Sequence, residues 1–433
     1  MGDTSLVNGF VPLFVFVLAP VLLVLSISWR DGRWKHELGL AVPIAAGVTL
    51  VVLLVNERFK LIPYAFPTFF YLLLGLIVLA GVILVTGWRA DANWQRVVAV
   101  LATLSMVALL GVIVNRHYRY YPTVSNLLGK VAENELGLPE LNRISEEVAR
   151  TGTLPAKGYT VHTPIPGPKS GFTGRDAYVY LPPAYFATPA PELPVLLMLH
   201  GVPGGPENWP QAGNIDEVAD AFAATHDGKT PILVMPDSAG DTNNDTLCVN
   251  SERGNVETYL TEDVVDYVRA TFHPATGPNT IGVAGFSDGA FCSLLLALRN
   301  PEVFTTFGDY SGYSQPTLDP PKEALKEIFK GDQAAYDAHD PTKILAGRQF
   351  PGLSGWFEVG EQDPDPLEPT RAVSKQAAAA GIATCTLIRP GGHDFGFWED
   401  SFRHSLPFLS AKLGLTPMPS DLSGAVCENQ TGS

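Results

Sequence analysis

Residues 280–298 read TIGVAGFSDGAFCSLLLAL and decide the fold. The apolar residues 280–284 predict a short buried strand, and residues 291–298 predict a buried helix packed behind it. Between them lies GFSDG, with Ser287 at its centre. A serine on a sharp strand-to-helix turn needs small neighbours, and such a turn pushes the hydroxyl out of the sheet, where a base can reach it. The stretch therefore predicts that Ser287 is a nucleophile.

A second apolar stretch predicts the strand that carries an oxyanion loop. Residues 194–199 (PVLLML) form a continuous apolar run that ends in HGVPGG, residues 200–205. An α/β-hydrolase takes one oxyanion N–H from this loop and the other from the residue after the nucleophile. We therefore expect the backbone N–H groups of Val202 and Asp288 to form the oxyanion hole, with His200 shaping the loop.

Two further strand-like runs supply the remaining catalytic groups. Residues 355–359 (GWFEV) open into GEQDP, and residues 383–389 (ATCTLIR) open into PGGHD. A serine hydroxyl needs an imidazole to accept its proton, and a carboxylate must hold that imidazole in the right tautomer. We assign His393 as general base and acid and Asp363 as the orienting carboxylate. Glu361 and Asp365 lie close by in the sequence and are alternatives to Asp363.

Taken together, these motifs resemble a known family over residues 159–415. The segments LLMLHGVPGG, ILVMPDS, NVETYLTEDVV, GFSDGAFCSLLLALRNPEVF, FGDYSGY and GGHDFGFW are similar to those of the esterase family of α/β-hydrolases that includes esterase D, feruloyl esterases and the mycobacterial mycolyltransferases. The stretch DTLCVNSERGNVETYL also resembles actinobacterial members. The resemblance implies an α/β-hydrolase fold and a triad of Ser287, His393 and an acid in GEQDP.

The first third of the chain differs in composition from the rest. Residues 10–27, 38–55, 64–85 and 97–114 are apolar runs without Asp, Glu, Lys or Arg, and each is long enough to cross a bilayer. The first run has no basic segment before it and three more runs follow, so a cleaved signal peptide does not fit. We expect four transmembrane helices in residues 1–120, flanked by interfacial Trp and Tyr residues.

Basic residues favour one orientation of these helices. The first and third loops carry Arg30, Arg33, Lys35, Arg89 and Arg96, whereas the opposite side carries Arg58, Lys60, Arg116 and Arg119. Loops rich in Lys and Arg tend to stay in the cytoplasm. We therefore expect a multi-pass protein of the cell membrane with both termini, and the catalytic domain, on the outer side.

A polar segment separates the membrane part from the catalytic part. Residues 121–154 contain Gly and Pro breaks and predict a membrane-proximal linker. Residues 155–415 are enough for one α/β-hydrolase core, and residues 416–433 form a polar tail. Residues 313–349 insert a helical stretch between two core strands, which we expect to cover the pocket.

The cysteines bear on the compartment, and all four lie after the membrane part. Cys292 and Cys385 fall in a predicted helix and a predicted strand, which indicates buried core thiols. Cys248 lies in a loop and Cys427 in the polar tail, so we expect a Cys248–Cys427 disulfide, in keeping with an oxidising exterior. No His or Cys cluster has metal-ligand spacing, and the acidic loop 237–245 lacks the glutamate of an EF-hand, so we expect no metal and no cofactor.

Two tryptophans and the net charge bear on the ligand. Trp209 and Trp398 each follow a catalytic loop, and they either line the acyl pocket or pack beneath those loops. The formal net charge of −15 argues against a nucleic-acid partner, because a phosphate-binding surface needs concentrated Lys and Arg.

An activated serine with an oxyanion hole implies acyl transfer through a covalent intermediate. Helices that hold the domain at a bilayer raise the local concentration of amphiphilic substrates. We therefore expect a membrane-anchored serine esterase that hydrolyses an ester of a lipid or cell-envelope component. One alternative is an acyltransferase, similar to the mycolyltransferases, that moves an acyl chain to a sugar or lipid acceptor. The other is a non-catalytic membrane protein that binds or senses a partner.

Overall fold

This computed structural model describes residues 4–29, 32–59, 67–88, 92–132, 134–318 and 323–420. The chain divides into two compact units, Met1–Gly129 and Lys130–Ser433. The first unit contains the predicted membrane helices, and the second contains the predicted catalytic core.

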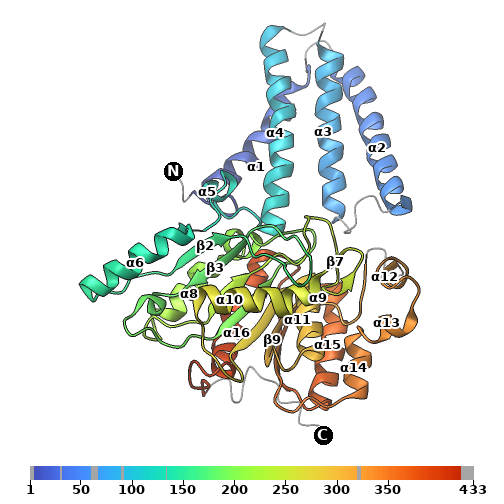
Figure 1. Ribbon diagram of the computed structural model, residues 1–433. Coiled ribbons are helices and arrows are strands. Elements are labelled where there is room, and N and C mark those ends of the chain that lie inside the picture. Colours follow the sequence, from blue (N-terminus) through green and yellow to red (C-terminus); the bar gives the residue numbers. More distant parts are fainter. Residues whose placement is uncertain are drawn as a thin grey trace. The chain divides into compact units, whose positions relative to one another are not determined.

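The N-terminal unit is helical (Figure 1). Its helices are α1 (Phe10–Ser26), α2 (Arg33–Phe59), α3 (Thr68–Gly87), α4 (Asn93–Tyr118) and the single turn α5 (Val124–Leu127). Helices α2, α3 and α4 are long and apolar enough to cross a membrane, whereas α1 has only 17 residues. At about 1.5 Å per residue, α1 is roughly 25 Å long, which is shorter than the ~30 Å hydrocarbon core of a bilayer. Among the described residues the prediction of four spanning helices is therefore wrong by one.

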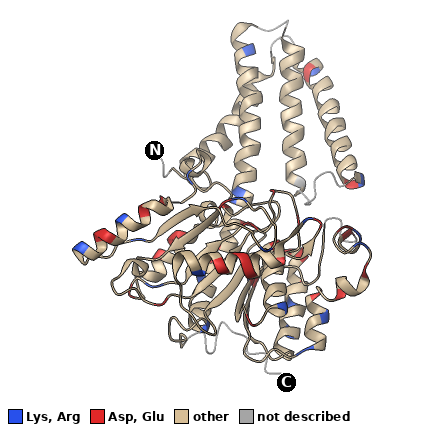
Figure 2. Ribbon diagram, in the orientation of Figure 1, with Lys and Arg blue, Asp and Glu red and all other residues tan. Residues whose placement is uncertain are grey.

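Small side chains allow the helices of this unit to pack closely. Ala19, Ala41 and Ala80 are buried where the helices meet, together with Met106. Close backbone approach at small residues is a main source of helix association in lipid, where burial of apolar surface gives no advantage. The charged residues of α2 and α4 lie toward the helix ends (Figure 2). Outward apolar side chains such as Leu72 remain exposed, as a lipid-facing surface requires.

The second unit is built on one nine-stranded mixed sheet. Its strands are β1 (Glu135–Leu136), β2 (Tyr159–Thr163), β3 (Ala177–Leu181), β4 (Val195–Leu199), β5 (Ile232–Met235), β8 (Ile281–Phe286), β9 (Thr306–Tyr310), β10 (Ser354–Gly360) and β11 (Ala383–Arg389). The spatial order is β1-β2-β3-β5-β4-β8-β9-β10-β11. Strand β3 is antiparallel to both β2 and β5, and the neighbours from β5 to β11 are parallel. A two-stranded ribbon, β6 (Asn250–Ser251) with β7 (Gly254–Asn255), lies apart from this sheet.

Helices cover both faces of the sheet. They are α6 (Leu138–Thr151), α7 (Asn208–Gln211), α8 (Ile215–Ala223), α9 (Val256–Thr258), α10 (Val264–Phe272), α11 (Asp288–Arg299), α12 (Glu323–Glu327), α13 (Gln333–Asp337), α14 (Pro341–Gly347), α15 (Pro364–Ala379) and α16 (Phe395–Lys412). Successive residues of a strand point to opposite faces. Trp356 of β10 meets Phe408 of α16, whereas Phe357 joins the core cluster that contains Val373 of α15. Helices α15 and α16 therefore lie on opposite faces, and the fold is an α/β-hydrolase sandwich (Figure 1).

The segment predicted as a linker is part of the second unit. Strand β1 pairs in parallel with β2, and α6 buries Leu141 and Val148 in the main core cluster. These two residues are seven apart, so they lie on the same side of the helix. The catalytic unit therefore begins near Lys130 and not at residue 155.

The inserted stretch between β9 and β10 contributes to the helical layer. Helix α14 contacts both α11 and α15, and Leu318, Ile328 and Leu345 join the main core cluster. Residues 319–322 lie outside the described part. The packing gives this insertion a structural role, while cover of the pocket stays a prediction.

The predicted disulfide pairing is wrong. Cys248 is bonded to Cys292, the second residue lies in α11, and the two Cα atoms are 5.6 Å apart. Cys385 is also disulfide-bonded, so neither Cys292 nor Cys385 is the buried thiol that the sequence suggested. Cys427 lies outside the described residues, as does the tail from residue 421 onward. The loop that holds Cys248 folds back over α11, and no local pattern in the sequence predicts this contact.

Candidate active site

Ser287 sits on a tight turn between β8 and α11. Its backbone has φ 56° and ψ −120°, a conformation that is costly for a residue with a side chain. Glycines make the turn possible, because a Cβ on Gly285 would clash with the backbone of Gly289, and a Cβ on Gly289 would clash with the carbonyl groups that end β4. The Ser287 N–H donates to the carbonyl oxygen of Tyr310 in β9 at 3.0 Å. Close packing at Gly285 and at Gly289, together with the hydrogen bond to Tyr310, thus holds the turn in place.

The structure brings Ser287, His393 and Asp363 together in one hydrogen-bonded chain. Ser287 Oγ lies 2.9 Å from His393 Nε2, and His393 Nδ1 lies 2.8 Å from Asp363 Oδ2. Since an ionised carboxylate only accepts, Nδ1–H donates to Asp363 and Nε2 is left to accept from the serine hydroxyl. The carboxyl ends of β8, β10 and β11 bring the three residues to one edge of the sheet. This arrangement can activate a hydroxyl for attack.

Of the three acids near the end of β10, only Asp363 reaches the imidazole. Its side chain is 5% exposed, against 32% for His393, while Glu361 and Asp365 are exposed. The turn that follows β10 is closed by the Asp363 N–H, which donates to the Gly360 carbonyl at 3.1 Å. This turn points Asp363 inward, and the residues two positions away on either side outward.

Gln362 couples the loop that carries Asp363 to the loop that carries His393, a role that no sequence pattern indicated. The Gly391 N–H donates to Gln362 Oε1 at 2.6 Å, and the Gln362 N–H donates to the Gly391 carbonyl at 2.9 Å. Two hydrogen bonds therefore join the segments that carry Asp363 and His393. Such a reciprocal pair limits how far the imidazole can move from its carboxylate.

The loop after β4 lies against the nucleophile, as the oxyanion prediction requires. A Cβ on Gly201 would lie 3.1 Å from Ser287 Cβ, so the backbone leading to Val202 runs directly beside the serine. Asp288 is the first residue of α11, and N–H groups in the first turn of a helix have no acceptor within that helix. The helix dipole also favours negative charge at this end.

Both tryptophans are buried and pack against Phe286 at the end of β8. Trp209 is fully buried, its Nε1–H donates to the Leu199 carbonyl at 3.0 Å, and its ring meets Phe286 edge-on. Trp398 stacks on Phe286 with ring centroids 4.4 Å apart and meets His393 edge-on at 4.9 Å. These contacts show packing for both residues, and a role in the acyl pocket stays a prediction.

Three carboxyl groups near the nucleophile turn have raised pKa values: Asp309 is buried, and Asp245 and Asp288 are half-buried. Burial raises the pKa of Asp288 well above its usual range, and the nearby Asp245 raises it further. Burial also raises the pKa of Asp245 to about 6. The two side chains are hydrogen-bonded to each other. Burial raises the pKa of Asp309, the neighbour of Tyr310, to about 7.

The chain belongs to an esterase family. The family model described as "Putative esterase" matches residues 173–409. An uncharacterized protein of Corynebacterium glutamicum is 29% identical over 427 residues, which cover 95% of this chain and 97% of that protein. This similarity extends over most of the N-terminal helical unit as well as the catalytic unit.

Solved structures show the same fold. A ferulic acid esterase has a TM-score of 0.52 and 18% identity, with 59% of this chain and 98% of that chain covered. An S-formylglutathione hydrolase from Agrobacterium tumefaciens has a TM-score of 0.51 and 18% identity, with 60% and 98% covered. Family membership, this fold and the chain of Ser, His and Asp side chains together support a hydrolase.

Proposed function

We propose that this protein is a membrane-anchored serine esterase that hydrolyses an ester of a lipid or cell-envelope component. The observation that carries the proposal is the continuous hydrogen-bonded chain Ser287–His393–Asp363, with distances of 2.9 and 2.8 Å. An imidazole with one nitrogen on a buried carboxylate and the other on a strained, glycine-flanked serine is the arrangement that makes a hydroxyl nucleophilic.

The reaction follows from these positions. Ser287 Oγ attacks the ester carbonyl carbon while His393 Nε2 takes the hydroxyl proton. The backbone N–H groups of Val202 and Asp288 bind the oxygen that becomes negative. His393 then gives the proton to the leaving alcohol, and the acyl group remains on Ser287. Water, deprotonated by the same imidazole, releases the acid in the second half of the reaction.

Membrane attachment rests on the N-terminal unit. Three of its helices have the length and apolar composition of spanning helices, and a relative that covers nearly the whole chain aligns over both units. The side on which the catalytic unit lies depends on α4 alone, because this helix precedes it directly. With the loop before α4 in the cytoplasm, the catalytic unit is outside whether or not α1 crosses.

The disulfide supports an extracytoplasmic catalytic unit. Cys248 and Cys292 are bonded, and no cysteine in the described part of the chain is free. Structural disulfides persist in oxidising compartments and are rare in the cytosol. Substrates that reach the unit there are lipids of the outer leaflet and esters of the envelope.

Full-length protein in lipid vesicles tests the proposal. We expect hydrolysis of a long-chain fluorogenic ester embedded in the vesicle to exceed hydrolysis of the same ester in a detergent micelle at equal protein, and Ser287→Ala to abolish both. Released free acid supports the esterase. Acyl transfer to an added sugar that dominates over free acid would establish the acyltransferase instead, and no turnover by folded protein with any ester would favour a binding role.

A further inference from the structure

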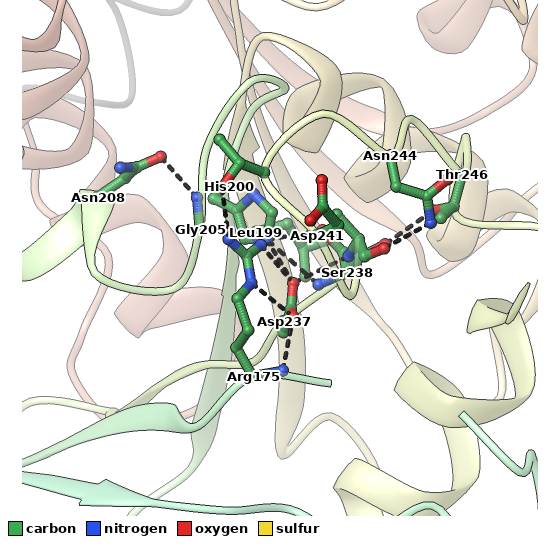
Figure 3. A network of polar contacts seen from close by, with 12 residues as sticks. Arg175, Leu199, His200, Gly205, Asn208, Asp237, Ser238, Asp241, Asn244 and Thr246 are labelled. Carbon is green, nitrogen blue, oxygen red and sulfur yellow. Dashed lines mark hydrogen bonds and ion pairs between the residues drawn. The ribbon is translucent and has the colours of Figure 1, made fainter. Parts of the chain in front are cut away.

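The loop between β5 and β6, residues 236–249, carries a buried carboxylate, Asp237, that forms an ion pair with the partly exposed Arg175. Arg175 donates to Asp237 three times, from its backbone N at 2.7 Å, from Nε at 2.9 Å and from Nη2 at 2.8 Å (Figure 3). Burial opposes ionisation of Asp237, but the hydrogen bonds from Arg175 and His200 hold the pKa of Asp237 below its usual range. Asp237 is therefore an ionised carboxylate in the interior.

This carboxylate fixes the imidazole that supports the oxyanion loop. His200 is fully buried, and its Nε2 lies 3.2 Å from Asp237 Oδ1 (Figure 3). Its Nδ1 lies 2.8 Å from the carbonyl oxygen of Gly201. Gly201 directly precedes Val202. A second tie joins the two loops, because the Gly204 N–H donates to the Thr242 carbonyl at 3.0 Å. The path of the backbone through Val202 thus depends on the β5–β6 loop.

The far end of the same loop is attached to the helix of the second donor. Asp245 is hydrogen-bonded to the side chain of Asp288, whose backbone N–H is the other oxyanion donor. Four residues further along α11, Cys292 is bonded to Cys248. Between these ends the loop is braced internally, since Thr246 Oγ1 donates to the Ser238 carbonyl at 2.7 Å.

We propose that the β5–β6 loop positions both oxyanion donors, with Asp237 and His200 acting on Val202 and Asp245 acting on Asp288. The proposal rests on the proposed acyl transfer. None of these three side chains hydrogen-bonds Ser287, His393 or Asp363 among the described residues. They are positioning residues, because each acts on the reacting oxygen only through a backbone N–H.

Geometry explains why such remote ties matter. An oxyanion donor works when it lies about 2.7–3.1 Å from the developing charge, and loss of one donor lowers kcat by roughly 100–1,000-fold. A donor that shifts without being lost should cost less than its removal. We therefore expect about 10–100-fold lower kcat when a positioning residue is removed, with KM changed less than about threefold.

Two amide substitutions of His200 separate its two contacts. In His200→Asn the side-chain amide can replace Nδ1–H toward Gly201, whereas in His200→Gln it reaches instead toward Asp237. We expect His200→Asn to retain more kcat than His200→Gln, and we expect both variants to keep the pH profile of kcat/KM, since His393 and Asp363 are untouched. Equal kcat in folded His200→Gln and native protein, or a loss confined to KM, would overturn the assignment.

Asp245 gives an independent test at the other donor. Asp245→Asn keeps a hydrogen-bonding group toward Asp288, whereas Asp245→Leu removes it. We expect kcat of Asp245→Asn within about threefold of native and kcat of Asp245→Leu lower by roughly tenfold or more. Equal kcat for the two variants, with both folded by circular dichroism, would contradict the role of this contact.

Arg299→Met is the matched control for Arg175→Met. Arg299 forms a comparable partly buried ion pair with Glu257, at 2.7 Å, at the opposite end of α11 from the nucleophile. Both substitutions should lower thermal stability, but only Arg175→Met should also lower kcat. A similar fall in kcat for both variants would mean that the β5–β6 loop supports the fold in general and does not position the oxyanion donors. Absence of fluorophosphonate labelling at Ser287 in the native protein would instead contradict the proposed esterase function. The role of the loop, which depends on that function, would then also be lost.

Discussion

Two His–Asp pairs lie at the same edge of the sheet, and they do different work. In the first, His393 is 32% exposed and bonds Asp363 through Nδ1, so that Nε2 faces the Ser287 hydroxyl. In the second, His200 is fully buried, its Nδ1 faces the Gly201 carbonyl, and its Nε2 meets Asp237 and the Ser238 N–H. The same two residue types therefore form a general base in the first pair and a structural support for the oxyanion loop in the second.

The difference lies in what the second nitrogen of each ring meets. An imidazole can move a proton only when one nitrogen has access to the reacting group. His393 has that access because its side chain is 32% exposed and its Nε2 lies 2.9 Å from Ser287 Oγ. His200 lacks it because Asp237, itself neutralised by Arg175, closes the other side. A histidine next to an aspartate is thus not evidence for catalysis until both nitrogens are traced.

The largest effect should come from removing the base or the nucleophile. Ser287→Ala or His393→Ala should lower kcat by about 10,000-fold or more, because proton removal and covalent attack act as a unit. Steady-state hydrolysis of a chromogenic ester measures kcat for each variant. Residual activity above a few per cent in either variant would place the chemistry elsewhere.

The two aspartates should differ by orders of magnitude. Asp363→Asn leaves His393 in the wrong tautomer and should lower kcat by about 10,000-fold, whereas Asp237→Asn moves only the oxyanion loop and should lower kcat by roughly 10–100-fold. Parallel kinetics at one pH compare them. If folded Asp237→Asn lost as much kcat as Asp363→Asn, the two pairs could not be assigned different roles, one catalytic and one structural.

The disulfide should contribute to stability more than to chemistry. The double variant Cys248→Ala/Cys292→Ala opens a bridge between residues 44 positions apart and should lower the free energy of unfolding by about 2–5 kcal/mol. Urea unfolding measures this, and kcat of the folded variant should fall by less than about tenfold. A total loss of kcat at full folding would show that the bridge does more than hold the loop.

The pH dependence of stability should report Asp309. Burial raises the pKa of this carboxyl from 3.8 to about 7, so between those values the folded chain holds a proton that the unfolded chain releases. Its contribution is complete below about pH 4 and is lost as pH rises through about 7, with a slope of at most about 1.4 kcal/mol per pH unit. Asp309→Asn should flatten that part of the profile in urea titrations, and an unchanged slope would contradict the assignment.

The smallest effects should come from the acids beside Asp363. Glu361→Gln and Asp365→Asn change exposed side chains and should leave kcat within about twofold. A large loss in either variant would mean that the carboxylate of the triad changes partner during turnover.

Local patterns in the sequence were enough to locate much of the site. Strands β4, β8, β10 and β11 are apolar runs that end in loops with Gly, Ser, Asp or His, and the parallel sheet brings those ends together without further information. The turn after β10 decides that Asp363, and not Glu361, faces the imidazole, and the sequence alone did not predict the geometry of this turn.

What the sequence could not show depends on contacts between distant segments. Cys248 meets Cys292 because the β5–β6 loop folds back over α11. Trp209 is buried by Phe286, which follows it by 77 positions. The segment predicted as a linker joins the core because α6 packs its Leu141 face under the sheet edge.

The most direct measurement is intact-mass spectrometry of the protein after brief mixing with an ester substrate. We expect an added mass equal to the acyl group, located by peptide mapping to the peptide that contains Ser287 and missing in Ser287→Ala. Hydrolysis that proceeds at the same rate in Ser287→Ala, or an acyl group found on another residue, would contradict it.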